Sequence, residues 1–118
     1  MASSILAAEM AAAETVASAM ESATNTICLV KNTILLIHTV LKLGADTTSN
    51  GNIPALMAHN EYMMGLTIGT MQDSLELAKR QVAAGAGARG AKAAVANHPE
   101  IQILENTLTY MRTTLAAF

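Results

Sequence analysis

The sequence predicts an all-α protein: a long, coiled-coil-like helical hairpin followed by a shorter C-terminal helix. Apolar residues recur every three or four positions through most of the 118 residues. Apart from one pair of glycines, Pro and Gly are confined to a few short stretches that would separate helices. No segment alternates apolar and polar residues with the period of two that a half-buried strand requires.

The first predicted helix spans about residues 3–43, which contain neither Pro nor Gly. A stripe with four–three spacing runs along its first part: Leu6, Met10, Ala13, Ala17, Met20, Thr24 and Ile27. It continues one step out of phase as Val30, Ile34, Ile37 and Leu41. A repeat of this length is typical of a coiled-coil-like helix. One long helix is the first expectation, and a break near residues 22–26 is the alternative.

The second part of this helix, residues 27–43, is apolar on two neighbouring faces. One face carries Ile27, Val30, Ile34, Ile37 and Leu41, and the other carries Leu29, Leu36, Val40 and Leu43. A helix that is apolar on more than one face is buried in a protein, an assembly or a bilayer. So short a chain has few other elements to cover this surface, so we expect a partner.

A loop is predicted for residues 44–52, with Gly44 placed to end the first helix. The second helix spans about residues 53–84, with Pro54 in its first turn. Its apolar stripe is Met57, Met64, Ile68, Met71, Leu75, Ala78 and Val82. Three glycines in residues 85–90 predict a flexible joint, with a turn as the alternative.

The last helix is predicted for about residues 98–118, with Asn97 as its N-cap, Pro99 in the first turn and Glu100 three residues after the cap. Its stripe is Ile101, Leu104, Leu108, Met111, Leu115 and Phe118. Residues 1–118 are therefore predicted to form a single helical domain.

Ten residues are predicted to form helix-packing or assembly contacts. Gly65 and Gly69 lie one turn apart inside a helix and would let another helix approach closely, within the hairpin or between subunits. The other eight are the seam residues Ile34, Ile37 and Leu41, the methionines Met64 and Met71, and the last-helix residues Leu108, Met111 and Leu115.

The composition indicates modest stability for one copy alone. Charged residues make up 14% of the chain and aromatic residues 3%, without Trp, so the usual large core side chains are scarce. Eight methionines partly replace them. The single cysteine, Cys28, excludes an internal disulfide and is expected to be a buried thiol.

Charge is distributed unevenly, although the net charge is only −2. Residues 1–30 carry three acidic and no basic side chains, whereas residues 79–92 carry Lys79, Arg80, Arg89 and Lys92 and no acidic one. A solvated basic end is the first interpretation, and pairing with the acidic end of another copy is the second. Nucleic-acid binding is disfavoured, because the chain is acidic and lacks a reader motif.

No catalytic residue, cofactor or metal site is predicted, because the chain lacks phosphate-loop, nucleophile-elbow and metal-ligand motifs. A membrane span is not favoured, since Lys31, Asn32 and His38 interrupt the apolar run. The N-terminus lacks a signal-peptide pattern, which predicts a cytoplasmic protein or one exported without a cleavable signal peptide.

The helices are rich in Ala, Met and Thr and poor in aromatic residues, and in this they resemble bacterial secreted filament subunits and R-body proteins. The segments that carry the resemblance to R-body proteins are Pro54, Ala55 and Leu56, followed by Met63, Met64 and Gly65. The resemblance implies a filament or ribbon and carries over no functional residue.

Three hypotheses follow for the function. The first is a non-enzymatic structural subunit that binds copies of itself as a homo-oligomer, filament or ribbon. The second is a membrane-active or lipid-associating helical protein. The third is a small helical adaptor or chaperone that binds another protein.

Overall fold

The computed structural model describes residues 2–42 and 52–116, which form three helices and no strand. Helix α1 is Ala2–Lys42, α2 is Asn52–Ala96 and α3 is Pro99–Ala116. The all-α prediction is confirmed. Most of the predicted loop 44–52, with Gly44, lies outside the described residues, as do residues 117–118.

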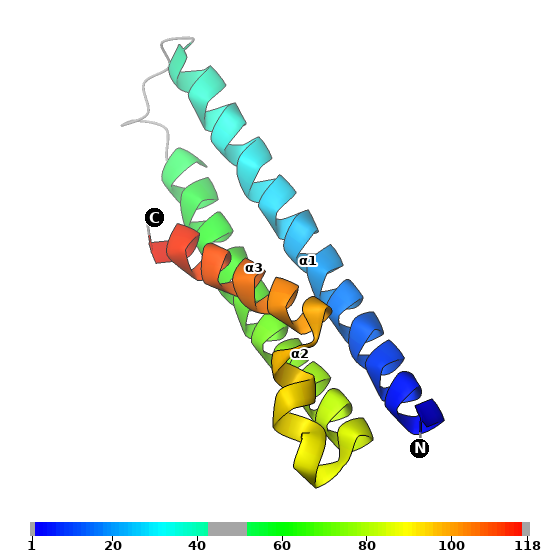
Figure 1. Ribbon diagram of the computed structural model, residues 1–118. Coiled ribbons are helices and arrows are strands. Elements are labelled where there is room, and N and C mark those ends of the chain that lie inside the picture. Colours follow the sequence, from blue (N-terminus) through cyan, green and yellow to red (C-terminus); the bar gives the residue numbers. More distant parts are fainter. Residues whose placement is uncertain (1, 43–51, 117–118) are drawn as a thin grey trace.

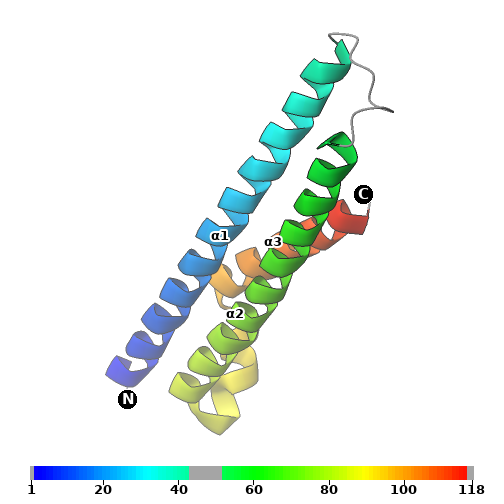
Figure 2. The same ribbon diagram turned by 180° about the vertical axis from the view of Figure 1, so that it is seen from behind.

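Helices α1 and α2 form an antiparallel hairpin, and α3 packs across it (Figures 1 and 2). The molecule is a rod of 65 × 19 × 16 Å. Both views place the N-terminus and the chain reversal near residue 87 at the same end of the rod. The acidic first part of α1 and the basic segment of α2 are therefore neighbours at one end of the molecule.

Helix α1 is continuous over 41 residues, so the alternative break near residues 22–26 does not occur. Its buried stripe consists of Ala12, Val16, Ala19, Ala23, Thr26 and Val30. The predicted stripe was wrong in its first part, because Leu6 and Met10 are each 58% exposed. Its later members Met20 and Ile27 pack partly against the core, and Val30 is buried. The small side chains at the observed contact let α2 and α3 approach α1 closely. The large side chains Leu6 and Met10 therefore did not mark the contact face.

Helix α2 buries most of its predicted stripe, namely Met64, Ile68, Met71, Ala78 and Val82. Met57 is an exception, because it is exposed in the first turns of α2, well before the core residue Ile68. The helix extends through the predicted joint to Ala96, and Gly87 is its one non-helical residue. Its φ of 77° and ψ of 172° suit glycine, and the chain reverses direction there (Figure 1).

Helix α3 begins at Pro99, whose fixed φ suits the first helical position. The predicted cap Asn97 was wrong by one residue: the N–H of Ile101 donates to Nδ1 of His98 at 3.4 Å, and the N–H of Gln102 donates to the His98 carbonyl at 3.2 Å. The imidazole Nδ1 of His98 therefore accepts the capping hydrogen bond that was expected for the Asn97 side-chain oxygen. Helix α3 buries Ile101, Leu104, Leu108 and Met111.

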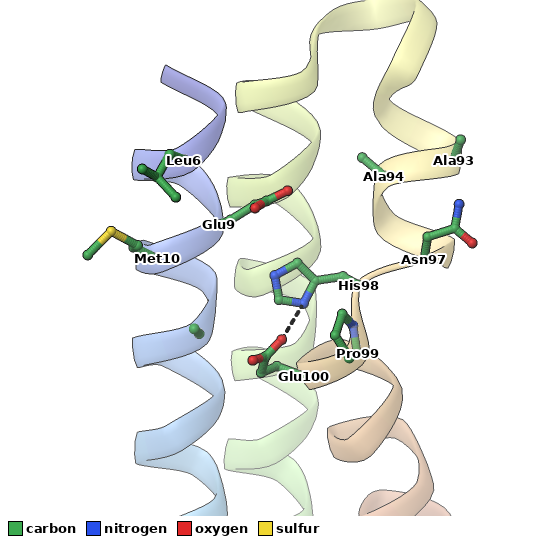
Figure 3. Close-up of a pocket in the computed structure, with 10 residues that line it drawn as sticks. Leu6, Glu9, Met10, Ala93, Ala94, Asn97, His98, Pro99 and Glu100 are labelled. Atoms are coloured by element: carbon green, nitrogen blue, oxygen red, sulfur yellow. Dashed lines mark ion pairs between the residues drawn. The ribbon is translucent and has the colours of Figure 1, made fainter. Parts of the chain in front are cut away.

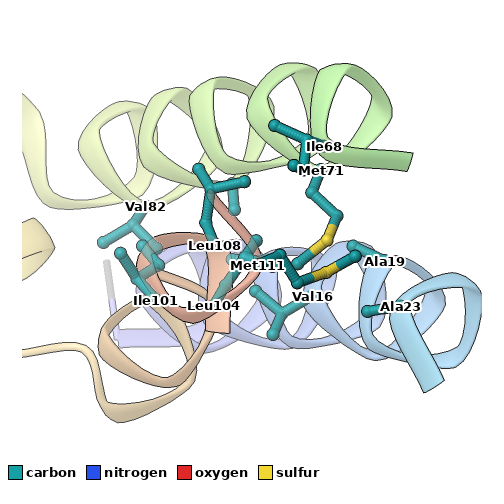
Figure 4. Close-up of a cluster of buried hydrophobic side chains, with 12 residues drawn as sticks. Val16, Ala19, Ala23, Ile68, Met71, Val82, Ile101, Leu104, Leu108 and Met111 are labelled. Carbon is teal, nitrogen blue, oxygen red and sulfur yellow. The ribbon is translucent and has the colours of Figure 1, made fainter. Parts of the chain in front are cut away.

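The core lies where the three helices meet, and it pairs small α1 side chains with large ones from α2 and α3 (Figure 4). Its labelled members are Val16, Ala19 and Ala23 of α1, Ile68, Met71 and Val82 of α2, and Ile101, Leu104, Leu108 and Met111 of α3. Met71 and Met111 are fully buried, and their unbranched side chains fill space that aromatic rings would otherwise occupy.

A buried hydrogen bond joins the two long helices beyond this core. The hydroxyls of Thr26 and Thr67 lie 2.7 Å apart, and both side chains are buried. A buried hydroxyl left without a partner would cost about 1–3 kcal/mol, so the pair favours one register of α1 against α2.

Candidate functional site

A dense group of exposed apolar side chains lies in residues 29–36 of α1, here called the open segment. Leu29 is 40% exposed, Ile34 52%, Leu35 55% and Leu36 54%. Single exposed apolar side chains are ordinary on a protein surface, but contiguous patches mark interaction sites. The open segment is therefore the first candidate for a binding surface.

An apolar groove of about 280 Å³ connects the open segment with the core. Its walls are Ile27, Val30, Ile34 and Leu35 of α1, Met64 of α2, and Tyr110, Met111 and Thr114 of α3, with Lys31 as its one charged residue. Met64 and Met111 are buried, so the groove extends from the exposed side chains of α1 to the interior of the molecule.

The predicted seam residues Ile34, Ile37 and Leu41 differ in their exposure. Ile34 is exposed, Ile37 is half-buried, and the side chain of Leu41 lies outside the described part of the structure. Leu35, which belonged to neither predicted face, is also exposed and lines the groove. The sequence did contain a signal for this exposure: residues 34–36 are all apolar, and three successive helical residues cannot all face the core.

Gly65 and Gly69 are exposed on α2. A Cβ added to either glycine would meet nothing within 4 Å. The predicted close contact is therefore absent within the hairpin, and only the alternative of a contact between subunits stays open. Exposed Leu66 and Tyr62 lie on the same helix nearby.

The remaining predicted contact residues stabilise the chain itself. Met64, Met71, Leu108 and Met111 are buried, and Leu115 packs partly against the core. They serve helix packing within one copy and leave little side-chain surface for a second copy.

Cys28 is exposed, so the expectation of a buried thiol was wrong. It lies two residues after Thr26 and two before Val30, both of which face the helix partners. A step of two residues turns a helical side chain by about 200°, which places Cys28 on the outer side of α1.

A cleft of about 460 Å³ lies between the first turns of α1 and the start of α3 (Figure 3). We call it the acidic cleft, because its charged residues are Glu9 and Glu100; its other walls are Leu6, Met10, Ala13, Ala93, Ala94, Asn97, His98 and Pro99. The His98 side chain is only 6% exposed, and its Nδ1 lies 3.3 Å from Oε2 of Glu100.

Two interactions compete for Nδ1 of His98. In a neutral ring whose Nδ1 accepts the Ile101 N–H, the proton is on Nε2. The ion pair with Glu100 requires the doubly protonated ring instead. No hydrogen bond joins Nε2 to another described residue, so this nitrogen can serve a group that enters the cleft.

The chain exposes 7596 Å² of surface. A compact monomer of 12.3 kDa would expose roughly 6,100 Å² by the usual scaling with mass. The surplus of roughly 1,500 Å² exceeds the roughly 800 Å² that each partner buries in an interface of standard size. A rod of 65 × 19 × 16 Å exposes more surface than a compact molecule of the same mass, which accounts for a surplus of this kind.

Within residues 2–42 and 52–116, no group of three or more His, Cys, Asp or Glu side chains could hold a metal ion. No helix in that part of the chain is long and apolar enough to cross a membrane. The sequence matches no family model and no curated protein, and the structure search finds no matching solved structure.

Proposed function

We propose that this protein is a non-enzymatic structural subunit that assembles with copies of itself through the open segment and the adjoining apolar groove. The observation that carries the proposal is that two half-exposed apolar side chains, Ile34 and Leu35, line a groove that leads into the core.

The energy available from this surface is comparable to the cost of association. Fully burying one large apolar side chain contributes about 1.5–3 kcal/mol, so covering the exposed halves of Ile34 and Leu35 contributes roughly 1.5–3 kcal/mol per copy. A symmetric contact doubles that figure to roughly 3–6 kcal/mol, which reaches only the lower end of the cost of association, roughly 4–15 kcal/mol. The open segment alone would give weak pairing, and further contacts are needed for a stable assembly.

The glycine pair of α2 supplies a second contact in this proposal. Gly65 and Gly69 offer a flat patch one helical turn long, with the exposed side chains of Leu66 and Tyr62 beside it. A helix of another copy can approach such a patch closely, with the two large side chains at its edge.

Polar side chains within the same stretch favour a protein partner over lipid. Lys31, Asn32 and His38 are exposed among the apolar residues of α1. A helix lying in a membrane surface would segregate polar and apolar faces more cleanly. Lys31 also lines the apolar groove, where an acyl chain would have to pass a charged group.

The test is size-exclusion chromatography with light scattering over a range of concentrations, without detergent. The proposal predicts species larger than one copy whose mass rises with concentration, and elongated particles in electron microscopy. A monomer at every concentration would overturn the proposal and favour an adaptor. Recovery only in the presence of detergent would overturn it in favour of a lipid-associating protein.

A substitution of Gly65 tests the glycine contact separately. We expect Gly65→Leu to reduce assembly while helicity is kept, because the added side chain has open space within its own copy but blocks a close neighbour. Ala84→Leu is the matched control: it adds a similar side chain at an exposed position of α2, about five turns away. Equal particle sizes for wild type and Gly65→Leu would remove the glycines from the contact.

A further inference from the structure

The short helical segment 88–96, which follows the reversal at Gly87, separates two surfaces of opposite charge. Ala93, Ala94 and Asn97, just beyond its end, line the acidic cleft. Ala91, Lys92 and Val95 line a different depression of about 340 Å³. At 100° per residue these two sets point in nearly opposite directions from the segment.

The second depression is here called the basic groove. Its charged residues are Lys79, Arg80 and Lys92, and its floor is formed by Ala83, Ala91 and Val95. Lys79 makes an ion pair with Glu105 at 2.8 Å. Arg80 and Lys92 are exposed, and the ion pairs among the described residues do not include them. Arg80 donates from Nε to the Glu76 carbonyl at 3.4 Å. Two cations of the groove are thus available to a partner.

The acidic cleft has the chemistry to receive such a cation. Glu9 is exposed at its wall, and Figure 3 shows Glu100 and the His98 ring on the side formed by α3. Leu6 and Met10 provide apolar wall beside the carboxylates. A Lys or Arg side chain matches this combination, since its aliphatic stem packs on apolar surface while its charged head meets a carboxylate.

The His98 ring forms part of the wall of the acidic cleft. The ring is 6% exposed, its Nδ1 accepts from the Ile101 N–H, and Glu100 lies 3.3 Å from the same nitrogen. Among the described residues, every side-chain nitrogen or oxygen that is closed off from solvent has a hydrogen-bond partner. The contact therefore rests on charge: the exposed Glu9 carboxylate of the cleft is complementary to the exposed Lys92 of the groove.

We propose that the acidic cleft of one copy binds the basic groove of a second copy, which deepens the proposed self-assembly and rests on it. A copy cannot fill its own cleft with its own groove, because the two face opposite sides of segment 88–96. The contact is heterologous: each copy offers a cleft to one neighbour and a groove to the other, so copies add in one direction. Both surfaces lie at the same end of the rod, so the copies associate side by side.

Charge reversal on each side tests this contact. We expect Glu9→Lys in the cleft and Lys92→Glu in the groove each to weaken self-association by roughly fivefold or more, as measured by sedimentation at low salt. An equal mixture of the two variants should associate again, because each then meets a partner of opposite charge. Glu9→Gln should act in the same direction with a smaller loss, and circular dichroism checks that each variant is folded.

The matched controls are Glu21→Lys on α1 and Arg112→Glu on α3, which make the same charge changes at exposed positions outside both surfaces. They should leave association unchanged. If wild type assembles and the cleft and groove variants assemble equally well, the charged contact is wrong while apolar assembly stands. If wild type is monomeric under every condition, the proposed function itself fails. Loss in the variants without recovery in the mixture would also overturn the charged contact.

Discussion

Residues 12–23 and residues 29–36 belong to one uninterrupted helix, yet they lie in different surroundings. The first stretch buries its small side chains against α2 and α3, whereas the open segment leaves four large apolar side chains about half exposed. The more hydrophobic stretch is thus the less covered one. Local hydrophobicity indicates that a surface needs a partner, but only the arrangement of the other helices decides whether the chain supplies it.

The largest expected difference between the two regions is in stability. Met71→Ala, which empties the core opposite residues 12–23, should lower the free energy of unfolding by about 2–5 kcal/mol. Leu35→Ala in the open segment should change it by about 0.5 kcal/mol or less in a single copy. Urea denaturation at low protein concentration measures both; similar losses would mean that the open segment is already covered.

For self-association, substitutions in the open segment should have a larger effect than substitutions in the core. Changing both Ile34 and Leu35 to Lys removes apolar surface that only a neighbour would cover, so self-association should weaken roughly a hundredfold while helicity is kept. Light scattering and circular dichroism give the two readouts. An Ile5→Lys control alters an exposed apolar residue at the opposite end of α1. Unchanged association of the double variant would contradict the assembly proposal.

The boundary between the two regions is the buried threonine pair. Thr26→Val or Thr67→Val leaves one hydroxyl without its partner and should cost about 1–2 kcal/mol of stability. The double variant replaces both hydroxyls by methyl groups and should recover most of that loss. A double-mutant cycle in thermal unfolding checks this; two additive losses would mean that the hydroxyls do not depend on each other.

The smallest effect is expected at the exposed glycines. Gly65→Ala and Gly69→Ala should each raise single-copy stability by about 0.5–1 kcal/mol, because Ala favours the helix and its Cβ has open space. Denaturation at low concentration measures the gain. A loss of stability in either variant would place a neighbouring group closer to α2 than the structure does.

The sequence was sufficient for the fold class and for the α3 face, where Ile101, Leu104 and Leu108 follow one clear period. It was insufficient for the first part of the α1 contact face, because alanines occur on several faces there. The prediction chose Ala13 and Ala17, whereas the structure buries Ala12 and Ala19. The sequence could not locate the turn, because any of the three glycines in residues 85–90 can adopt a positive φ. In the described residues, Gly87 is the one that does.

The candidate surfaces were harder to predict than the helices. The apolar excess of residues 27–43 was visible in the sequence, but its extent depends on where α3 runs. The acidic cleft brings Glu9 and His98 together from segments about 90 positions apart, and no local pattern encodes such a contact. The uneven charge of the two segments was the only sequence signal for that site.

The most direct test of the central claim is amide hydrogen exchange at low and high protein concentration. If the open segment binds another copy, exchange in peptides covering residues 29–36 should slow as concentration rises, while exchange in residues 12–23 should be unchanged. Exchange rates in residues 29–36 that are independent of concentration would contradict the account.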